Sequence, residues 1–342
     1  MKYLITGHTG FKGVWLSLML KELGHSVYGF SLPAEPNSLF ASSHTQDYLD
    51  GHVILDIRDR KQLVEAMKGV EPDIIIHLAA QSLVLESYQK PIETYETNVF
   101  GTLNLLIAAE EVGSSKALLG VTSDKVYKPK MGSVPHNEDD ALGGQDPYST
   151  SKVMADQLLQ SWSSNYGSKL NSNHTIGIAR AGNVIGGGDH NKNRLVPDLV
   201  NSITRNESIQ LRYPNAVRPW QHVLDCLSGY LKLTEKLSVG EFGEAWNFGP
   251  NLEEIKSVED FTNEFCGNFG IRNKWNKIEA DEKENSYLVL DSSKAQSRLG
   301  WLPKLNFTES VSLTAAWHKK VIQGKSPREA TIEDIHTYLS VG

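Results

Sequence analysis

The first thirteen residues constrain this chain more than any other segment. They read MKYLITGHTGFKG, with an apolar stretch at Leu4-Ile5 and glycines at positions 7, 10 and 13. A strand that ends in such a turn and runs into a helix lets backbone N–H groups approach a pyrophosphate at the positive end of the helix. A P-loop is excluded, because Lys12 is followed by glycine and not by Ser or Thr. The segment therefore predicts a dinucleotide-binding turn.

Strand and helix patterns alternate through the first half of the chain. The continuous apolar run at Ile74–Leu78 is typical of a central parallel strand covered on both faces. The alternation predicts an α/β fold with a Rossmann-type, doubly wound parallel sheet. Expected strands are Lys2–Thr6, Ser26–Phe30, Val53–Leu55, Ile74–Leu78, Lys116–Val121 and Thr175–Ala179, and expected helices are Phe11–Leu23, Arg60–Lys68, Thr94–Val112 and Pro147–Trp162, the last capped by Asp146.

The pattern changes after Arg180. Glycines 186–188 form a loop, prolines separate shorter elements, and helices are expected at Val223–Lys236, Val258–Gly267, Ser292–Leu299 and Phe307–Gln323. We expect residues 1–180, with a return segment near 223–249, to form the cofactor-binding domain. Residues 181–222 and 250–342 should form a smaller, discontinuous C-terminal α/β lobe that binds the substrate.

Composition limits the classes of partner. The 342 residues are 39% hydrophobic and 22% charged, as in ordinary globular proteins. A net charge of -7 offers no basic surface for nucleic acid. Cys226 and Cys266 lack metal-ligand or disulfide-framework spacing, which indicates a reduced, cytoplasmic protein. No signal-peptide pattern precedes the first strand, no apolar run is long enough to cross a bilayer, and we expect no metal site.

Tyr148 and Lys152 are the first pair that could do chemistry. They lie four residues apart in the helix that Asp146 is expected to cap, so they share one face. An ammonium beside a phenol favours the phenolate. Such a tyrosine can take a proton from a substrate hydroxyl while hydride leaves for a nicotinamide. The alternative is an exposed helix pair with no catalytic role.

Ser123, Asp124 and Lys125 directly follow the strand Lys116–Val121. Ligands of open parallel sheets bind beyond the carboxyl ends of the strands, so these side chains should face the crevice. A carboxyl group beside an amine offers a proton donor and a proton acceptor. The alternative is a polar turn whose charges point to water.

Two further segments fit a cofactor. Residues 77–81 (HLAAQ) end a strand with small side chains that would let a cofactor lie close, although His77 itself fits a packed, hydrogen-bonded histidine better. Asp56 could accept a hydrogen bond from an adenine amine, or could cap the next helix. Residues 29–31 (GFS) contain neither an acid for a ribose 2′-hydroxyl nor an arginine for a 2′-phosphate, which leaves NAD and NADP open.

A loop in the second half carries candidate substrate ligands. Arg212 and Arg218 flank a proline-containing segment that ends in Trp220. Arginine grips phosphate oxygens through two parallel hydrogen bonds, and an aromatic ring can cover an apolar ligand face. The alternative is a pair of solvated arginines.

Together these segments resemble the extended short-chain dehydrogenase/reductase family, and within it the nucleotide-sugar 4,6-dehydratases that act on CDP-glucose. The resemblance covers nearly the whole chain. Lys125 stands where dTDP-glucose dehydratases carry a glutamate, which favours the cytidine branch, whereas residues 284–287 (ENSY) depart from the family pattern. The matching segments are 6–13, 77–81, 122–127 (TSDKVY), 146–149 (DPYS), 179–189 (ARAGNVIGGGD), 218–222 (RPWQH) and 299–303 (LGWLP).

The resemblance implies NAD as cofactor, a nucleotide-sugar substrate, CDP-glucose, and a homodimer or homotetramer that uses the long helices Thr94–Val112 and Pro147–Trp162. The implied cofactor-binding residues are Gly7, Thr9, Gly10, Phe11, Lys12, Gly13, Asp56, Ile57, Leu78, Ala79, Ala80, Gln81, Asn98, Tyr148 and Lys152, and the implied substrate-binding residues are Asn183, Arg194, Leu195, Arg212, Arg218 and Trp220.

The implied mechanism uses Ser123, Asp124, Lys125, Tyr148 and Lys152. Tyr148, supported by Lys152 and Ser123, removes the proton of the C4 hydroxyl while the C4 hydride passes to NAD. Lys125, or a group that it orients, then removes the C5 proton while Asp124 protonates the departing C6 hydroxyl, and hydride returns to C6. Three alternatives stay open: a nucleotide-sugar C4 epimerase, a 4,6-dehydratase for another nucleotide sugar, and a dinucleotide-binding sensor without catalysis.

Overall fold

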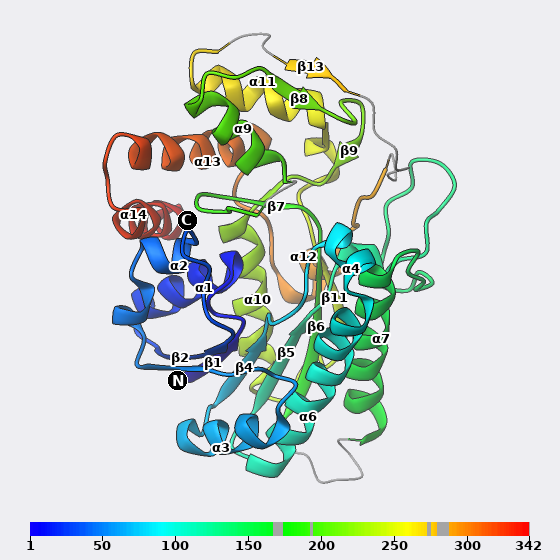
Figure 1. Ribbon diagram of the computed structural model, residues 1–342. Coiled ribbons are helices and arrows are strands. Elements are labelled where there is room, and N and C mark those ends of the chain that lie inside the picture. Colours follow the sequence, from blue (N-terminus) through cyan, green and yellow to red (C-terminus); the bar gives the residue numbers. More distant parts are fainter. Residues whose placement is uncertain (167–173, 192–193, 272–274, 279–286, 342) are drawn as a thin grey trace.

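The computed structural model describes residues 1–166, 174–191, 194–271, 275–278 and 287–341. At its centre lies a seven-stranded sheet in which all strands run parallel (Figure 1). The strand order is β11-β6-β5-β4-β1-β2-β3, so the chain starts inside the sheet and winds outward in both directions. The predicted doubly wound parallel sheet is confirmed. Its strands are β1 (Lys2–Thr6), β2 (Ser26–Ser31), β3 (Gly51–Ile54), β4 (Ile74–His77), β5 (Ala117–Val121), β6 (Thr175–Ala181) and β11 (Ala245–Phe248).

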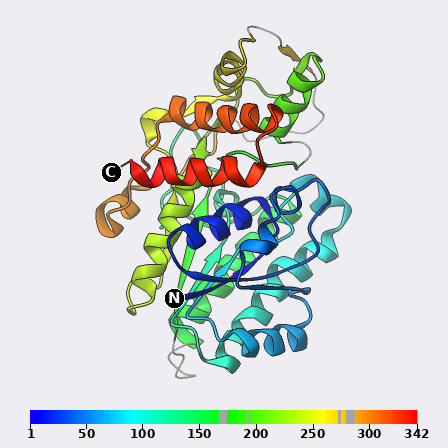
Figure 2. The same ribbon diagram turned by 90° about the vertical axis from the view of Figure 1, so that its left-hand side faces the viewer.

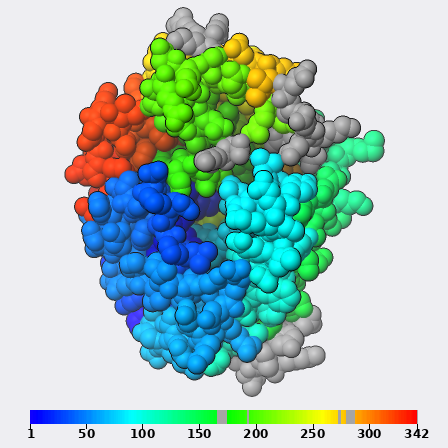
Figure 3. Space-filling view, viewed as in Figure 1, coloured from blue at the N-terminus to red at the C-terminus, as the bar shows by residue number. Residues whose placement is uncertain are grey.

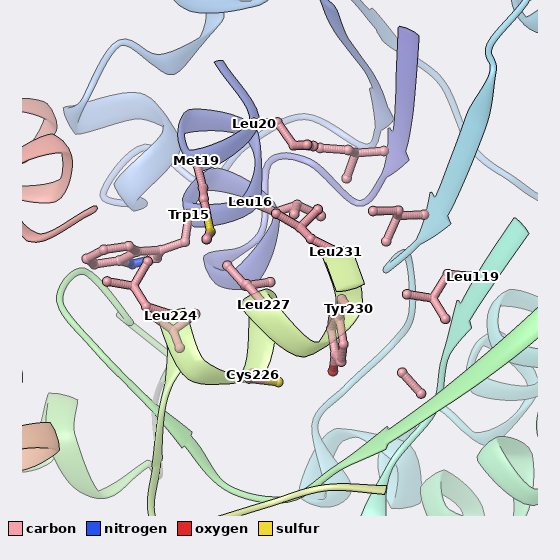
Figure 4. Packing of buried hydrophobic residues seen from close by; sticks show 14 of the residues in the cluster. Trp15, Leu16, Met19, Leu20, Leu119, Leu224, Cys226, Leu227, Tyr230 and Leu231 are labelled. Atoms are coloured by element: carbon pink, nitrogen blue, oxygen red, sulfur yellow. The ribbon is translucent and has the colours of Figure 1, made fainter. Parts of the chain in front are cut away.

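Helices cover both faces of the sheet. On one face lie α3 (Arg60–Val70), α6 (Gly101–Val112) and α7 (Pro147–Ser161), and on the other lie α1 (Phe11–Glu22) and α10 (Val223–Leu237). The alternation of β1 explains this, since Tyr3 and Ile5 join one buried cluster and Leu4 joins the other. Figure 4 shows Trp15, Leu16 and Met19 of α1 packed against leucines of α10. Each buried leucine of this contact contributes about 1.5–3 kcal/mol.

The smaller lobe lies beyond the carboxyl ends of the strands. Its own buried cluster includes Leu199, Trp220 and Phe261. After α10 the chain returns to the sheet as β11, next to β6, as the pattern of 223–249 suggested. The remaining elements are β7 (Val184–Ile185), α9 (Leu195–Thr204), β8 (Ile209–Leu211), β9 (Val217–Arg218), β10 (Gln221–His222), η5 (Leu252–Glu254), β12 (Lys256–Ser257), α11 (Val258–Asn268), β13 (Trp275–Lys277), α12 (Ser293–Leu299), α13 (Phe307–Ile322) and α14 (Pro327–Ser340). Of these, α12 and α14 pack into the same buried cluster as α1 and α10.

Most expected elements are found within one or two residues of their expected ends, but the stretch Thr94–Val112 is not one regular α-helix. It consists of the end of α5 (Pro91–Tyr95), a π-helical turn η2 (Glu96–Phe100) and α6. Asn98 lies in the π-turn and is buried. The remaining short helices are α2 (Leu39–Ser42), η1 (Thr45–Tyr48), α4 (Val84–Gln89), η3 (Asp124–Val126) and η4 (Trp162–Tyr166).

The sequence did not indicate helices α9 and α14. In α14 the buried positions include Thr331 and Asp334 beside Ile335 and Tyr338, so the buried face is partly polar and no clear apolar stripe exists. Figure 2 shows α14 between α13 and α1, and the Tyr338 hydroxyl donates a hydrogen bond to Asp225 of α10 at 2.8 Å. The last helix thus contacts α10 through this bond, and it packs on α1, where Nε2 of His336 lies 2.6 Å from a carboxylate oxygen of Glu22. None of the helices in the described ranges has both the length and the apolar character needed to cross a membrane.

Candidate active site

The glycine turn between β1 and α1 has no room for side chains at two of its three glycines. Gly7 has φ +77°, and a Cβ there would lie 2.7 Å from the backbone nitrogen of Ala79. A Cβ on Gly13 would lie 2.3 Å from the carbonyl oxygen of Gly7. Gly10, by contrast, is exposed and meets nothing closer than 3.4 Å. Because no side chain caps α1, the turn leaves its first N–H groups to an outside acceptor.

The carboxyl end of β4 lies beside this turn. His77 accepts a hydrogen bond at Nδ1 from Thr6 (2.6 Å) and donates from Nε2 to Thr102 (3.0 Å), whose own hydroxyl proton goes to the Asn98 carbonyl. Burial lowers the pKa of His77 to about 3, so the ring is neutral. The expectation of a packed histidine is confirmed. Leu78, Ala79 and Ala80 follow it and are half-buried.

The π-helical turn that contains Asn98 holds Gln81, which follows the end of β4. The backbone N–H of Gln81 donates to Oδ1 of Asn98 (2.8 Å), and Nδ2 of Asn98 donates to the Gln81 carbonyl (2.9 Å) and to Ser151 (2.8 Å). The Asn98 amide therefore connects β4 to α7. Both amide protons of Asn98 are used in hydrogen bonds inside the protein, so Asn98 supports the predicted cofactor site from behind.

Other predicted cofactor positions differ in exposure. Asp56 is half-buried, and its Oδ2 accepts hydrogen bonds from Nη2 (2.6 Å) and Nε (2.9 Å) of Arg58, which hold the pKa of the carboxyl below its usual range. The alternative that Asp56 caps the next helix is wrong, because Asp59 caps α3. Ile57 is buried against Gly101. Near the turn, Thr9 bonds the Ser31 hydroxyl (2.7 Å), Lys12 donates to the Tyr230 hydroxyl (3.3 Å), and Phe11 is buried in the α1 core.

Helix α7 places Tyr148 and Lys152 at the carboxyl end of β5. Asp146 accepts from the Ser149 N–H and completes a capping box, with Pro147 in the first turn, as predicted. Ser87 accepts from the Tyr148 N–H at 3.1 Å. The Lys152 ammonium donates to the Val121 carbonyl at 2.9 Å. Both side chains are over nine-tenths buried, so the alternative of an exposed helix pair is wrong.

Burial shapes the electrostatics of this pair. Burial and, to a smaller extent, the charge of Lys12 lower the pKa of Lys152 to about 8, against the opposing effect of Asp156. Burial raises the pKa of Tyr148, whereas the Ser123 hydroxyl and the charge of Arg194 lower it. Tyr148 is therefore a neutral phenol at rest, beside groups that favour its ionised form.

Asp124 is a buried carboxyl group, so the alternative that it points to water is wrong. Its Oδ1 accepts from the Ser123 hydroxyl at 3.0 Å, whereas Oδ2 is buried without a hydrogen-bond partner among the described residues. Burial raises its pKa despite Lys125, Ser123 and Arg218, which act in the opposite direction. Burial thus favours the protonated form of this carboxyl more than water would. Lys125 follows it and is half-buried.

The predicted substrate residues separate into two groups. Arg218 is buried and affects the pKa of Asp124, and Arg194 affects that of Tyr148, so both lie near the reactive groups. Asn183 and Leu195 are half-buried. Arg212 is exposed. Trp220 packs on Phe261, and its indole N–H donates a hydrogen bond to the Lys256 carbonyl. Trp220 thus supports the small lobe's core and does not present its ring to a ligand. Residues 284–286 lie outside the described residues.

A buried ion pair that the sequence did not indicate braces these groups. Arg180 of β6 donates to Asp156 of α7 at 2.7 and 2.9 Å, and both side chains are almost completely buried. Asp156 also accepts from Thr122 (2.9 Å), the residue before Ser123, and Arg180 donates to Tyr127 (2.9 Å). The sequence signal that could have revealed this pair is Arg180, a charged residue in an otherwise apolar strand. Asp189 similarly holds Arg194 at 3.1 Å.

These elements meet around a hollow. Figure 3 shows the surface recessed where the N-terminal segment, the residues after β4 and the small lobe come together. The described ranges contain no cluster of three side chains suited to a metal ion. The site thus combines an open glycine turn, a tyrosine–lysine pair, and a buried acid.

The chain is similar to known nucleotide-sugar enzymes in sequence and in fold. The sequence model of the family described as GDP-mannose 4,6 dehydratase matches residues 4–314. CDP-glucose 4,6-dehydratase of Salmonella typhimurium is 41% identical over 347 aligned residues, which cover 99% of this chain and 96% of that enzyme. Among solved structures, UDP-glucose 4-epimerase of Thermotoga maritima superimposes with a TM-score of 0.82 at 22% identity (94% and 100% covered), and dTDP-glucose 4,6-dehydratase of Streptomyces venezuelae, solved with NAD, with 0.80 at 24% identity (96% and 100% covered).

Proposed function

The chain belongs to the GDP-mannose 4,6 dehydratase family, within the extended short-chain dehydrogenases/reductases, and we propose that it is an NAD-dependent CDP-glucose 4,6-dehydratase. The reaction converts CDP-glucose to CDP-4-keto-6-deoxy-glucose and water. The observation that carries the proposal is the carboxyl oxygen of Asp124 that is buried without a hydrogen-bond partner in the described part of the chain, close to Ser123 and Tyr148. A C4 epimerase needs the tyrosine and lysine but has no step for such an acid.

The residues around the glycine turn fit NAD. Gly10 leaves open space, and the uncapped start of α1 supplies N–H donors for the pyrophosphate. Asp56 and Ile57 would hold the adenine, and residues 78–81 would lie along the cofactor. When bound, NAD accepts the hydride from sugar carbon C4 and returns it to C6. Tyr148 and Lys152 would contact the nicotinamide end, because both lie at the carboxyl end of β5.

Tyr148 acts first, as the base for the C4 hydroxyl. Its phenol must lose a proton, which burial opposes and Ser123 assists. Lys152 is fixed by the Val121 carbonyl, and its positive charge favours the phenolate, which then accepts the proton of the C4 hydroxyl and becomes a neutral phenol again. Removal of the proton from C4–OH then allows the C4 hydride to leave.

Asp124 acts second, as the acid for the C6 hydroxyl. The new ketone at C4 acidifies the C5–H bond, and Lys125, or a group that it orients, takes that proton. The raised pKa of Asp124 keeps a proton available for the departing hydroxyl, which leaves as water. The diphosphate and the sugar would be held by Arg218, Arg194 and Asn183. The nucleotide side would be lined by Leu195, Arg212 and the loop that Trp220 supports.

The decisive measurement is mass spectrometry of the protein mixed with NAD and, separately, CDP-glucose, dTDP-glucose, UDP-glucose and GDP-mannose. We expect loss of one water from CDP-glucose alone. If water is lost from another of these nucleotide sugars instead, that compound is the substrate. An unchanged mass with an inverted C4 centre by NMR would identify an epimerase, and NAD binding without any turnover would identify a sensor.

Two variants test the assigned roles. Tyr148→Phe should lower substrate-dependent NADH formation by about 10²- to 10⁴-fold, the usual contribution of a general base. Asp124→Asn should still form NADH but should stall before water is lost. Wild-type water loss by Asp124→Asn would remove Asp124 from the mechanism.

We also propose that the protein is a cytoplasmic homodimer or homotetramer with two functional parts. Residues 1–180 and 223–249 would hold NAD, and the remaining segments would hold the nucleotide sugar. Ile92 (74% exposed) and Phe100 (59%) lie on the α5–η2 segment that packs beside α7, so a second copy covering them would bury apolar surface. Light scattering on the wild type and on Ile92→Lys tests the assembly. Both cysteines are free and buried, in line with a reducing compartment.

A further inference from the structure

Gly182 lies against the carboxyl group of Asp124. It follows β6 directly, and the Thr122 N–H donates to the Ala179 carbonyl (2.9 Å), so the end of β6 is fixed beside the turn that carries Asp124. A Cβ on Gly182 would lie 2.9 Å from Oδ2 of Asp124 and 2.7 Å from Cγ of Pro219. Real side-chain carbons do not occur at such distances. Any side chain at 182 must therefore displace the acid or the proline.

Space, and not backbone conformation, is what requires glycine here. Gly182 is not among the residues with positive φ, so an alanine could adopt its backbone angles without strain. On the other side, the Trp220 N–H donates to the Arg218 carbonyl at 3.0 Å, and this tight turn holds the Pro219 ring over Gly182. The neighbours of Oδ2 are thus fixed by a strand end and a proline turn.

Oδ2 is buried and has no hydrogen-bond partner among the described residues. Gly182 lies on one side of it, and the Pro219 ring closes the space that a Cβ on Gly182 would need. A charged carboxylate oxygen would lose its hydration here without replacement, so the neutral acid is favoured. Oδ1 is already taken by the Ser123 hydroxyl, which leaves Oδ2 as the oxygen that can carry the proton.

We propose that Gly182 and Pro219 form a seat for the proton-bearing oxygen of Asp124, and that glycine at position 182 is required for water elimination but not for oxidation of C4. This inference rests on the proposed function. In the step concerned, the C5–H bond breaks toward the base and a C5–C6 double bond forms. The C6–O bond breaks, the hydroxyl takes the proton from Oδ2, and Asp124 is left as the carboxylate. The base returns its proton to C5, hydride returns to C6, and the proton that Tyr148 took from the C4 hydroxyl restores the acid form of Asp124, which completes the balance.

The test is Gly182→Ala, examined in single turnover with NAD and CDP-glucose. NADH should form at a rate within about threefold of wild type, whereas water loss should fall by about 100-fold, at the lower end of the usual contribution of a general acid. Gly249→Ala is the matched control. It makes the same change at a buried glycine without positive φ, whose Cβ would meet nothing closer than 3.4 Å, and it should not alter either rate.

A second substitution makes the steric argument specific. Pro219→Ala removes the ring carbon that confines position 182, so Gly182→Ala combined with Pro219→Ala should recover at least tenfold of the lost elimination. The proposed role of Gly182 is wrong if Gly182→Ala eliminates water at the wild-type rate. It is also wrong if this variant loses NADH formation and water elimination to the same extent. Those results leave the proposed function intact, which instead fails if Asp124→Asn eliminates water normally.

Discussion

Loss of the charge on Asp156 should destabilise the protein by about 3–5 kcal/mol. The perturbation is Asp156→Asn, which keeps the shape of the side chain but leaves the Arg180 guanidinium without its anion. Arg180 is 1% exposed and its Nε and Nη2 both donate to Asp156. Breaking one partner of such a buried pair costs about 3–5 kcal/mol, because an uncompensated charge remains. The magnitude thus depends on the complete burial of the pair.

The assay is urea unfolding followed by tryptophan fluorescence, with the slope of the transition compared as a check on two-state behaviour. The control is Glu111→Gln, which breaks the Lys68–Glu111 pair of similar length (3.0 Å) but with both side chains half exposed. This control should cost under about 1 kcal/mol. Replacing both buried charges, with Asp156→Leu and Arg180→Met together, should recover more than half of the loss. A cost for Asp156→Asn no larger than the control's, or a double variant no more stable than Asp156→Asn, would refute the reasoning.

Three other outcomes are expected. Lys152→Met should raise the free energy of unfolding at pH 7 by roughly 1–3 kcal/mol while it abolishes turnover, because burial lowers the pKa of Lys152 to about 8. Between pH 8 and 10.5, Lys152 of the wild type is protonated in the unfolded chain but mostly neutral in the folded protein. The free energy of unfolding should therefore rise with pH across that window, and urea titrations of Lys152→Met should lack this rise. Gly7→Ala should reduce both stability and NAD affinity, whereas Gly10→Ala, with open space, should reduce NAD affinity alone, as calorimetry and urea unfolding can distinguish. Arg218→Ala should weaken CDP-glucose binding at least tenfold and leave NAD binding unchanged in calorimetry; equal losses would indicate misfolding instead.

The parts of the fold that local rules determine were predictable from the sequence. The Asp146 cap with Pro147 gave the start of α7, and the apolar run at 74–78 gave a central strand, because both depend on neighbouring residues and on burial from two faces. The spacing of Tyr148 and Lys152 then followed from the helix itself. Their burial beside Ser123 did not, since it requires the pairing of β5 with β6.

The remaining features depend on contacts between distant segments. Trp220 was expected to face a ligand, but Phe261 and the Lys256 carbonyl, which are some forty residues away along the chain, position it inside the small lobe. The Arg180–Asp156 pair and the contact of Gly182 with Asp124 likewise join segments that the sequence does not relate. The π-turn at Asn98 escaped detection because its pattern is that of a helix.

The docking of α14 affects the order in which the nascent chain can fold. β1 emerges from the ribosome first but lies in the middle of the sheet, and β11 completes an edge only after residue 248 has been made. Helix α14 then packs on α1, where His336 lies 2.6 Å from a carboxylate oxygen of Glu22, and on α10, where Tyr338 donates to Asp225. At about 5–20 residues per second, translation from β11 to Tyr338 takes on the order of ten seconds. During that interval the surface of α1 that α14 will cover stays open to chaperones, so expression of this protein should depend on holdase capacity.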